Sequence, residues 1–238
     1  MRRRLFRLVP LAVVAVVGVA IVTSVCGDDE QGSAPDASGN LFGNPGFENG
    51  RDPWFSLKPP DFTVSDNAPL AGAGAALLEM RAPLDASGPA VYYLIQEISP
   101  TEFPEVISGY YRVENWTKGT PKQYLQFVVI AFDVKNIPGD FSNHQIRYPL
   151  AGIDSEPFPI GNAKFIFVTR EQPQQGQWVR FERNLREDFE QVWGAAPQNF
   201  TKLRILFEVR YDDKVSGDGT PEADVYWDDL FIGPRQSR

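Results

Sequence analysis

The chain of 238 residues is predicted to fold as an all-β sandwich of two packed antiparallel sheets. From residue 41 onward, short apolar or alternating runs recur between clusters of Pro, Gly, Asn and Asp, a pattern typical of strands joined by turns. Long amphipathic helical patterns are nearly absent. Since 42% of the residues are apolar, including 17 Phe and 5 Trp, one domain can fill a sizeable core.

Seven runs have the composition expected of strands. They are VYYLIQEI (91–98), EVISGYYRVENW (105–116), YLQFVVIAFDV (124–134), AKFIFVT (163–169), QWVRFERN (177–184), KLRILFEVRY (202–211) and DVYWDDLFI (224–232). In 202–211 apolar residues alternate with charged ones, which indicates one buried face. The middle of 124–134 is apolar on both faces, so we expect it at the centre of a sheet, covered on its second side by a groove or loop. The one expected helix is LREDFEQVWG (185–194), which Gly194 closes.

The chain is predicted to have four parts: a leader (1–25), a flexible tether (26–39), the sandwich (40–234) and a short tail (235–238). The leader begins with the basic stretch MRRRLFR and continues with an apolar run from Leu8 to Val25, which is the pattern of an export signal. This run of about eighteen residues is also at the lower limit of what spans a bilayer, so an uncleaved signal anchor is an alternative.

The chain's single cysteine, Cys26, stands where the apolar run ends and is followed by the tract GDDEQGSAPDASGN. This arrangement resembles a bacterial lipoprotein, which implies that Cys26 carries a lipid anchor. The preceding residues, Thr23, Ser24 and Val25, depart from the usual lipobox, so a signal-anchor helix and a cleaved, secreted form stay open. All three readings export the sandwich to the outer side of the cytoplasmic membrane or the cell surface, and two of them make the membrane a partner.

The charge of the chain argues against a nucleic-acid partner. The net charge is −8, and it becomes −12 once Arg2, Arg3, Arg4 and Arg7 of the leader are set aside. Such a surface repels phosphate backbones. A single cysteine excludes an internal disulfide and any multi-cysteine metal site, and a single histidine, His144, removes most zinc and catalytic-triad chemistry.

Both ends of the predicted sandwich carry a recognisable pattern. The segment NLFGNPGFENG (40–50), followed by Trp54, resembles the opening strand of carbohydrate-binding modules of families 4 and 9, and ADVYWDDLFIGP (223–234) resembles their closing strand. Between them, LIQEI followed by SGYYRV is similar to a pair of their central strands. The resemblance implies a jelly roll of the galactose-binding-domain-like type over nearly all of 40–234. Its motifs describe the shape of the superfamily more than the binding of sugar.

The resemblance also implies a structural Ca²⁺ between the first and last strands. Glu48 and Asp228 would supply carboxylates, and Gly46 would supply a carbonyl oxygen, with Glu79 as a further ligand. A hard cation needs six to eight oxygens, and a site that joins distant strands converts binding energy into fold stability. The alternative is that Glu48 and Asp228 are acids at loop edges that accept hydrogen bonds from the backbone.

A glycan-binding surface needs exposed aromatic rings beside polar side chains. Trp116, at the end of a predicted strand, meets that description, and Tyr111 and Arg112 precede it on opposite sides of the same strand. The segment 136–152 is predicted to be a long connection that presents hydrogen-bonding groups. These groups are Asn143, His144 and Tyr148, with Gln145 and Arg147 beside them. The alternative for this segment is a solvent-exposed crossover.

The sequence predicts a binding protein and not an enzyme. Acidic clusters occur at Asp212/Asp213 and Asp228/Asp229, but neighbours in sequence do not establish a catalytic pair across a cleft. No nucleophile elbow, phosphate-binding loop or HExxH motif is visible. The expected function is non-catalytic carbohydrate binding, with a polysaccharide or glycan as partner. The alternative is a structural subunit that docks another protein of the cell envelope.

Overall fold

The computed structural model describes residues 39–235, all of which belong to one compact unit. The leader, Cys26 and nearly all of the tether therefore lie outside the described residues. The ten strands are β1 (Thr63–Ser65), β2 (Ala75–Arg81), β3 (Gly88–Ile98), β4 (Val106–Thr117), β5 (Gln123–Phe132), β6 (Asn143–Ala151), β7 (Ala163–Phe165), β8 (Trp178–Asn184), β9 (Leu203–Lys214) and β10 (Glu222–Gly233). The helix α1 spans Leu185–Trp193. Among the described residues, no helix is long and apolar enough to cross a membrane.

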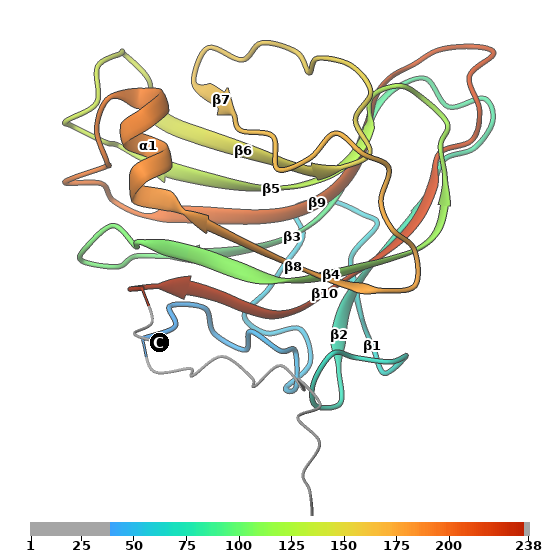
Figure 1. Ribbon diagram of the computed structural model, residues 1–238, viewed down its shortest axis with the longest axis horizontal. Coiled ribbons are helices and arrows are strands. Elements are labelled where there is room, and N and C mark those ends of the chain that lie inside the picture. The colour runs from blue at the N-terminus through green and yellow to red at the C-terminus, as the bar shows by residue number, and fades with distance from the viewer. Residues whose placement is uncertain (1–38, 236–238) are drawn as a thin grey trace, which may run out of the picture. The chain divides into compact units, whose positions relative to one another are not determined.

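The strands form two five-stranded sheets, which confirms the predicted β-sandwich (Figure 1). One, here called the β5 sheet, has the order β3-β9-β5-β6-β7, and the other, the β10 sheet, has the order β1-β2-β10-β4-β8. Neighbouring strands are antiparallel except for β6 and β7. In Figure 1, β3, β9, β5 and β6 occupy the upper half of the unit, and β8, β4 and β10 lie below them.

The core lies between the two sheets and is rich in aromatic rings. Phe207 on β9 is at its centre, with its ring centroid 5.0 Å from Trp227 on β10 and 6.2 Å from Phe127 on β5. Leu203, Ile205, Phe207, Val209 and Tyr211 all belong to this core, as the alternation in 202–211 predicts. Burying one such apolar side chain contributes about 1.5–3 kcal/mol, so these inward positions hold the sheets together.

The strand β5 is central in its sheet, between β9 and β6, and nine of its ten residues are buried. Its inner face meets the core, and its outer face is crowded by the segment that follows β6. This segment starts beside the beginning of β5, where the Asp154 amide donates to the Pro121 carbonyl at 3.0 Å and Lys122 Nζ lies 3.9 Å from the centre of the Phe158 ring. The expectation of a central strand covered on both sides is confirmed.

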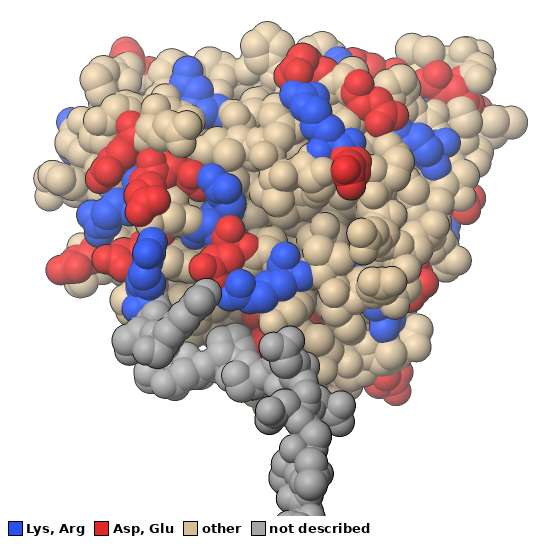
Figure 2. Space-filling view, viewed as in Figure 1, with Lys and Arg blue, Asp and Glu red and all other residues tan. Residues whose placement is uncertain are grey.

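Local capping fixes both ends of α1. The Asn184 side chain accepts a hydrogen bond from the Glu187 amide at 3.1 Å, and Gly194 takes a left-handed conformation with φ 85° that ends the helix. Leu185 and Phe189 bury the inward side of the helix. The predicted helix over 185–194 is therefore present. Acidic and basic side chains are interspersed near α1 and β8 on the face in Figure 2, where Arg180 pairs with Glu182 and Arg235 with Glu187.

Two sequence-based expectations about the elements are wrong. The segment 40–50 is not a strand, because positive φ values at Asn44 (49°) and Phe47 (60°) break it into turns. It still lies along β10, since the Leu41 amide donates to the Ile232 carbonyl at 2.8 Å. The supposed connection 136–152 contains β6, whose residues 144, 146, 148 and 150 alternate into the interior.

Candidate functional site

The contact between the segment 40–50 and β10, here called the seam, brings three of the four predicted metal ligands together. A Cβ added to Gly46 would lie 3.6 Å from Asp228 Oδ1 and 3.8 Å from Glu48 Oε1, so both carboxylates lie close to this glycine. A Cβ on Gly72 would overlap the Glu48 carboxylate. Two carboxylates therefore approach the backbone closely here, at positions where glycine leaves room.

The same loop between β1 and β2 holds both carboxylates. Asp228 Oδ2 accepts hydrogen bonds from the Leu70 amide at 2.9 Å and the Ala71 amide at 3.3 Å. Glu48 Oε2 accepts one from the Ala73 amide at 2.8 Å. Burial raises the pKa of Asp228 to about 6, although these backbone hydrogen bonds lower it. The buried acid charge at this seam is thus only partly compensated by the protein.

The donor types at the seam fit a hard cation such as Ca²⁺, which prefers carboxylate and carbonyl oxygens. Within the part of the chain that the structure describes, no group of three or more His, Cys, Asp or Glu side chains could hold a metal, so backbone oxygens would have to complete the shell. Glu79 lies elsewhere. It pairs with Asp224 in the ladder between β2 and β10, four residues before Asp228 and about 13 Å along the strand.

Trp116 is not the exposed platform that the sequence suggests. The segment after β6 covers it, because the Trp116 indole Nε1 donates to Gln172 Oε1 at 3.0 Å and a Cβ on Gly152 would lie 2.8 Å from the indole ring. The ring is half-buried and packs against the core. Sequence reasoning missed this cover because residues 152 and 172 are remote from Trp116 in the chain.

Tyr111 and Arg112 are both buried, on opposite sides of β4. The Tyr111 ring lies in the core, 5.9 Å from Trp227, and burial raises its pKa to about 12. Arg112 faces outward, but the loop after β1 closes over it, since its guanidinium donates to the Asn67 carbonyl at 3.0 Å and the Ala68 carbonyl at 2.9 Å. Neither residue is available to a ligand in this arrangement.

Asn143, His144 and Tyr148 lie on β6 but do not share a surface. His144 is fully buried edge-on against Trp193, 4.9 Å away, and burial lowers its pKa. Tyr148 stacks on Phe127 in the core at 4.4 Å, and burial raises its pKa. Asn143 is half-buried and bonds its neighbours Gln145 and Asn162. The six residues predicted from the sequence are therefore not brought to one face.

The structure instead gathers polar side chains on the outer face of the β5 sheet, meaning the side that points away from the core. The strand registers place these outward residues in rows across the sheet. They are Val91, Tyr93, Ile95 and Glu97 on β3; Arg204, Leu206, Glu208 and Arg210 on β9; Tyr124, Gln126, Val128 and Ile130 on β5; and Gln145, Arg147 and Pro149 on β6.

A connected polar network occupies the middle of this outer face. Gln126 Nε2 donates to Glu208 Oε2 at 2.6 Å, and Arg210 binds Glu208 at 3.4 Å and Asp212 at 2.6 Å. The Tyr124 hydroxyl donates to Asp212 Oδ2 at 3.0 Å, and burial raises its pKa. Burial alone would lower the pKa of Arg210, but Glu208 and Asp212 raise it overall. Tyr124 is therefore a phenol and Arg210 a fixed cation at neutral pH.

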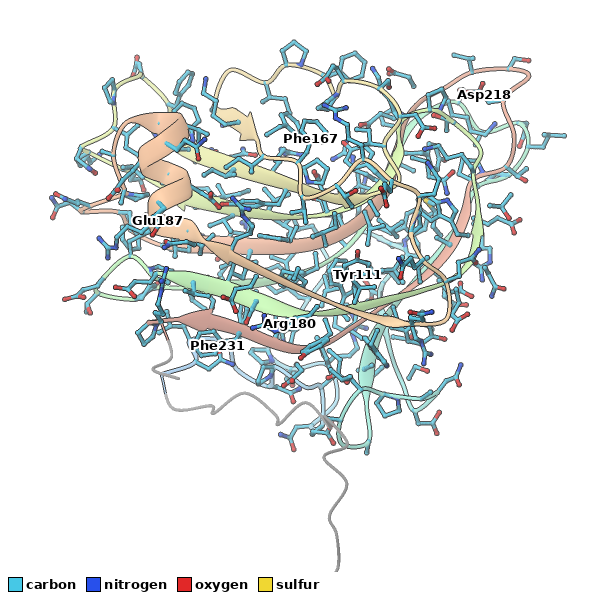
Figure 3. The ribbon with its side chains drawn as sticks, viewed as in Figure 1. Tyr111, Phe167, Arg180, Glu187, Asp218 and Phe231 are labelled. Atoms are coloured by element: carbon cyan, nitrogen blue, oxygen red, sulfur yellow. The ribbon has the colours of Figure 1, made fainter. Side chains whose placement is uncertain are left out.

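The network leaves hydrogen-bonding capacity unused. Gln126 Oε1, Arg147 Nε and Arg210 Nε are buried atoms without a hydrogen-bond partner among the described residues. An aromatic residue stands next to one of them, because Phe165 pairs with Arg147 in the β6–β7 ladder, and its ring lies 6.5 Å from that of Phe167 in a stacked arrangement. Phe167, labelled in Figure 3, also has the Arg170 guanidinium 3.7 Å from its ring centroid. A sequence signal existed, since Gln126, Glu208 and Arg210 are polar residues at outward positions of strands whose inward positions are apolar.

No family model and no curated protein matches the sequence. Among solved structures, the similar ones include TmCBM61 in complex with β-1,4-galactotriose, with 14% identity over 81% of this chain and 97% of that chain and a TM-score of 0.43. The xylan-binding domain from CBM 22 has 13% identity over 84% and 96% and a TM-score of 0.46. The endo-β-1,4-glucuronan lyase from the fungus Trichoderma reesei has 13% identity over 82% and 96% and a TM-score of 0.48. Similarity this distant gives no correspondence between functional residues.

Proposed function

We propose that the sandwich binds carbohydrate without cleaving it, and that the outer face of the β5 sheet holds the glycan. Sugars offer many hydroxyl groups and apolar C–H faces, so a site for them combines hydrogen-bonding side chains with aromatic rings. The polar network around Arg210 supplies the former, and Phe165 and Phe167 on the β7 side supply the latter. The candidate glycan-binding residues named in the sequence analysis do not combine hydrogen-bonding side chains and aromatic rings on one face.

One observation carries the proposal: three unpaired buried polar atoms gather on this one face, on Gln126, Arg147 and Arg210. An unsatisfied buried polar group costs about 1–3 kcal/mol, so proteins rarely keep several together without a partner. Hydroxyl groups of a bound sugar would supply both the donors and the acceptors that these atoms lack.

Binding without cleavage is supported by the state of the carboxylates. Glu208 and Asp212 both pair with Arg210, which stands between them on β9. Glycoside cleavage by paired carboxyl groups needs one protonated acid and one free base or nucleophile on either side of the scissile bond. Two carboxylates that share one cation on a single strand do not offer that division of roles.

Glycan arrays and affinity electrophoresis on residues 27–238 test the proposal, because the described unit encloses its own core and is expected to fold without the leader. Phe167→Ala should weaken binding about tenfold, equal to about 1.4 kcal/mol. Tyr110→Ala is the matched control. Tyr110 is a half-buried aromatic residue on β4, and because its neighbour Tyr111 points into the core, Tyr110 lies on the outer face of the other sheet, so this substitution should leave glycan binding unchanged.

Loss of binding with Trp116→Ala but not with Phe167→Ala would move the site to the end of β4. Release of reducing or unsaturated ends from a bound polysaccharide would refute the non-catalytic assignment.

We also propose that Gly46, Glu48 and Asp228 hold Ca²⁺ at the seam, where the ion would stabilise the fold and would not contact the glycan. Export and membrane anchoring through Cys26 are also proposals. Cell fractionation tests the anchor, since Cys26→Ser should release a lipid-anchored protein from the membrane and leave a signal-anchored one in place.

The alternative function, docking of another envelope protein, has one observation in its favour. Leu84 and Val215 are 70% and 60% exposed in adjacent loops, which a hydrogen bond of 3.0 Å from Lys214 Nζ to the Leu84 carbonyl joins. This alternative would be favoured if the protein bound no glycan on the array but captured an envelope protein, and if Leu84→Ser and Val215→Ser abolished that capture.

A further inference from the structure

Given the proposed glycan face, we infer that its ligand is an acidic polysaccharide, in which the carboxylate of a uronic acid residue pairs with Arg147. The inference rests on the proposed function and specifies its substrate class. It comes from a difference between the arginines of one surface, the outer face of the β5 sheet.

Arg204 and Arg210 already have carboxylate partners. Arg204 Nε donates to Glu97 Oε1 at 2.8 Å, and Lys202 binds the other oxygen of Glu97 at 2.8 Å. Arg210 lies between Glu208 and Asp212. These contacts neutralise both guanidinium groups within the protein, so neither is free to select a charged ligand.

Arg147 has no such partner. Within residues 39–235, no carboxylate lies within 4 Å of its guanidinium, and its one hydrogen bond runs from Nη2 to the neutral Gln145 Oε1 at 3.1 Å. Its Nε is buried and makes no hydrogen bond. A half-buried arginine in this state keeps its full charge and most of its donors available.

The ion pairs of the strands on this face single out the same residue. Lys202 and Arg204 pair with Glu97, and Arg210 pairs with Glu208 and Asp212. Among these four cations, Arg147 is the one without a carboxylate partner in the described part of the chain.

The position of Arg147 suits a sugar acid. It is paired with Val128 on β5 and with Phe165 on β7, so the neighbouring position on the next strand carries an aromatic residue. Gln126, whose Oε1 is unpaired, is its diagonal neighbour across the β5–β6 ladder. A uronate could place its C–H face on the ring, its carboxylate on the guanidinium and a hydroxyl group on Gln126.

A carboxylate fits Arg147 better than a hydroxyl group does. The guanidinium is planar and presents parallel N–H groups that match the two oxygens of a carboxylate, and such charge-assisted pairs are about twice as strong as neutral hydrogen bonds. A guanidinium also binds tetrahedral oxyanions through two parallel N–H groups, so a sulfated polymer gives the experiment a third arm that tests for general anion binding.

The test compares each acidic polymer with its own neutral form. Polygalacturonate and alginate, each beside its carboxyl-reduced product, are the probes in affinity electrophoresis of residues 27–238. At least one acidic polymer should bind tenfold or more tightly than its reduced form. Arg147→Gln should remove that preference, Arg147→Lys should keep part of it, and Arg180→Gln, at an exposed arginine on β8, should change nothing. Thermal melting of each variant establishes that it is folded.

Equal affinity for a polymer and its reduced form, or an unchanged preference in Arg147→Gln, would overturn the inference while neutral-glycan binding kept the proposed function. Equally strong, Arg147-dependent binding of dextran sulfate would also overturn it, because it would indicate general anion binding. Absence of binding to any glycan would overturn the inference and the proposed function together.

Discussion

The two sheets of the sandwich each carry an arginine at an outward position next to an aromatic residue, and the two arginines differ in what surrounds them. Arg112 on β4 lies 4.4 Å from the Tyr226 ring and 5.4 Å from the Trp178 ring, and the loop after β1 covers it with two carbonyl groups. Its Nε lies 3.4 Å from Glu114 Oε1. Arg147 on β6 pairs with the aromatic residue Phe165 in the strand register, but within the described residues its guanidinium meets no backbone carbonyl or carboxylate and donates only to the Gln145 side chain.

This difference separates a structural arginine from one that is available to a ligand. The loop over the β10 sheet binds Arg112 through its carbonyl groups and Asp228 through its amides, and on that face Arg112 Nε and Asp224 Oδ1 are the buried atoms that make no hydrogen bond among the described residues. The outer face of the β5 sheet keeps three unpaired buried atoms. Residue type alone does not decide the role of a polar side chain in a sandwich, because the decisive factor is whether the segment that lies over it supplies its partners.

The largest expected effect is on the closed face. Arg112→Ala should lower the free energy of unfolding by about 3–5 kcal/mol, because it leaves Glu114 and two loop carbonyl groups without their buried partner. Urea denaturation monitored by tryptophan fluorescence measures the change. A loss below about 1 kcal/mol would show that the loop does not depend on Arg112, and the contrast between the two faces would fail.

Calcium is expected to act on the same closed face. At a concentration one hundred times its dissociation constant, Ca²⁺ should stabilise the fold by about 2.7 kcal/mol, and EDTA should reverse the gain. Glu48→Gln and Asp228→Asn should abolish the effect, whereas Glu79→Gln, four residues along the strand from the seam, should retain it. Calorimetric melting with and without Ca²⁺ checks this, and an unchanged melting temperature in the unmodified protein would exclude the metal.

The elements that local patterns specify were predictable from the sequence. Alternation in 202–211 predicted the buried face of β9, and the run LREDFEQVWG with Gly194 at its end predicted α1. The strand β6 was missed although its apolar residues also alternate, because Pro and Gly on both sides favoured a loop. Local patterns thus predict secondary structure, except where a short strand has turn-forming residues close to both of its ends.

The candidate site was harder to predict, because it depends on contacts between distant residues. Trp116 and Arg112 both have the composition of binding residues, and only the segments around Gln172 and Asn67 decide that they are covered. The network of Gln126, Glu208 and Arg210 joins strands more than 80 residues apart. The seam residues Gly46, Glu48 and Asp228 were named from a family resemblance, and the structure brings these three together.

The smallest expected effect is on the outer face of the β5 sheet, and the sign of this effect tests the comparison. Arg147→Gln should change the free energy of unfolding by less than about 0.5 kcal/mol, or raise it slightly, because the arginine gives up hydration on folding and gains one neutral hydrogen bond in return. Urea denaturation beside Arg112→Ala measures both arginines on one scale. Residues kept for binding often cost stability, so a neutral or stabilising substitution at Arg147 would fit a ligand contact. A loss as large as that of Arg112→Ala would instead mean that Arg147 supports the fold, and the two faces would then differ only in which loop covers them.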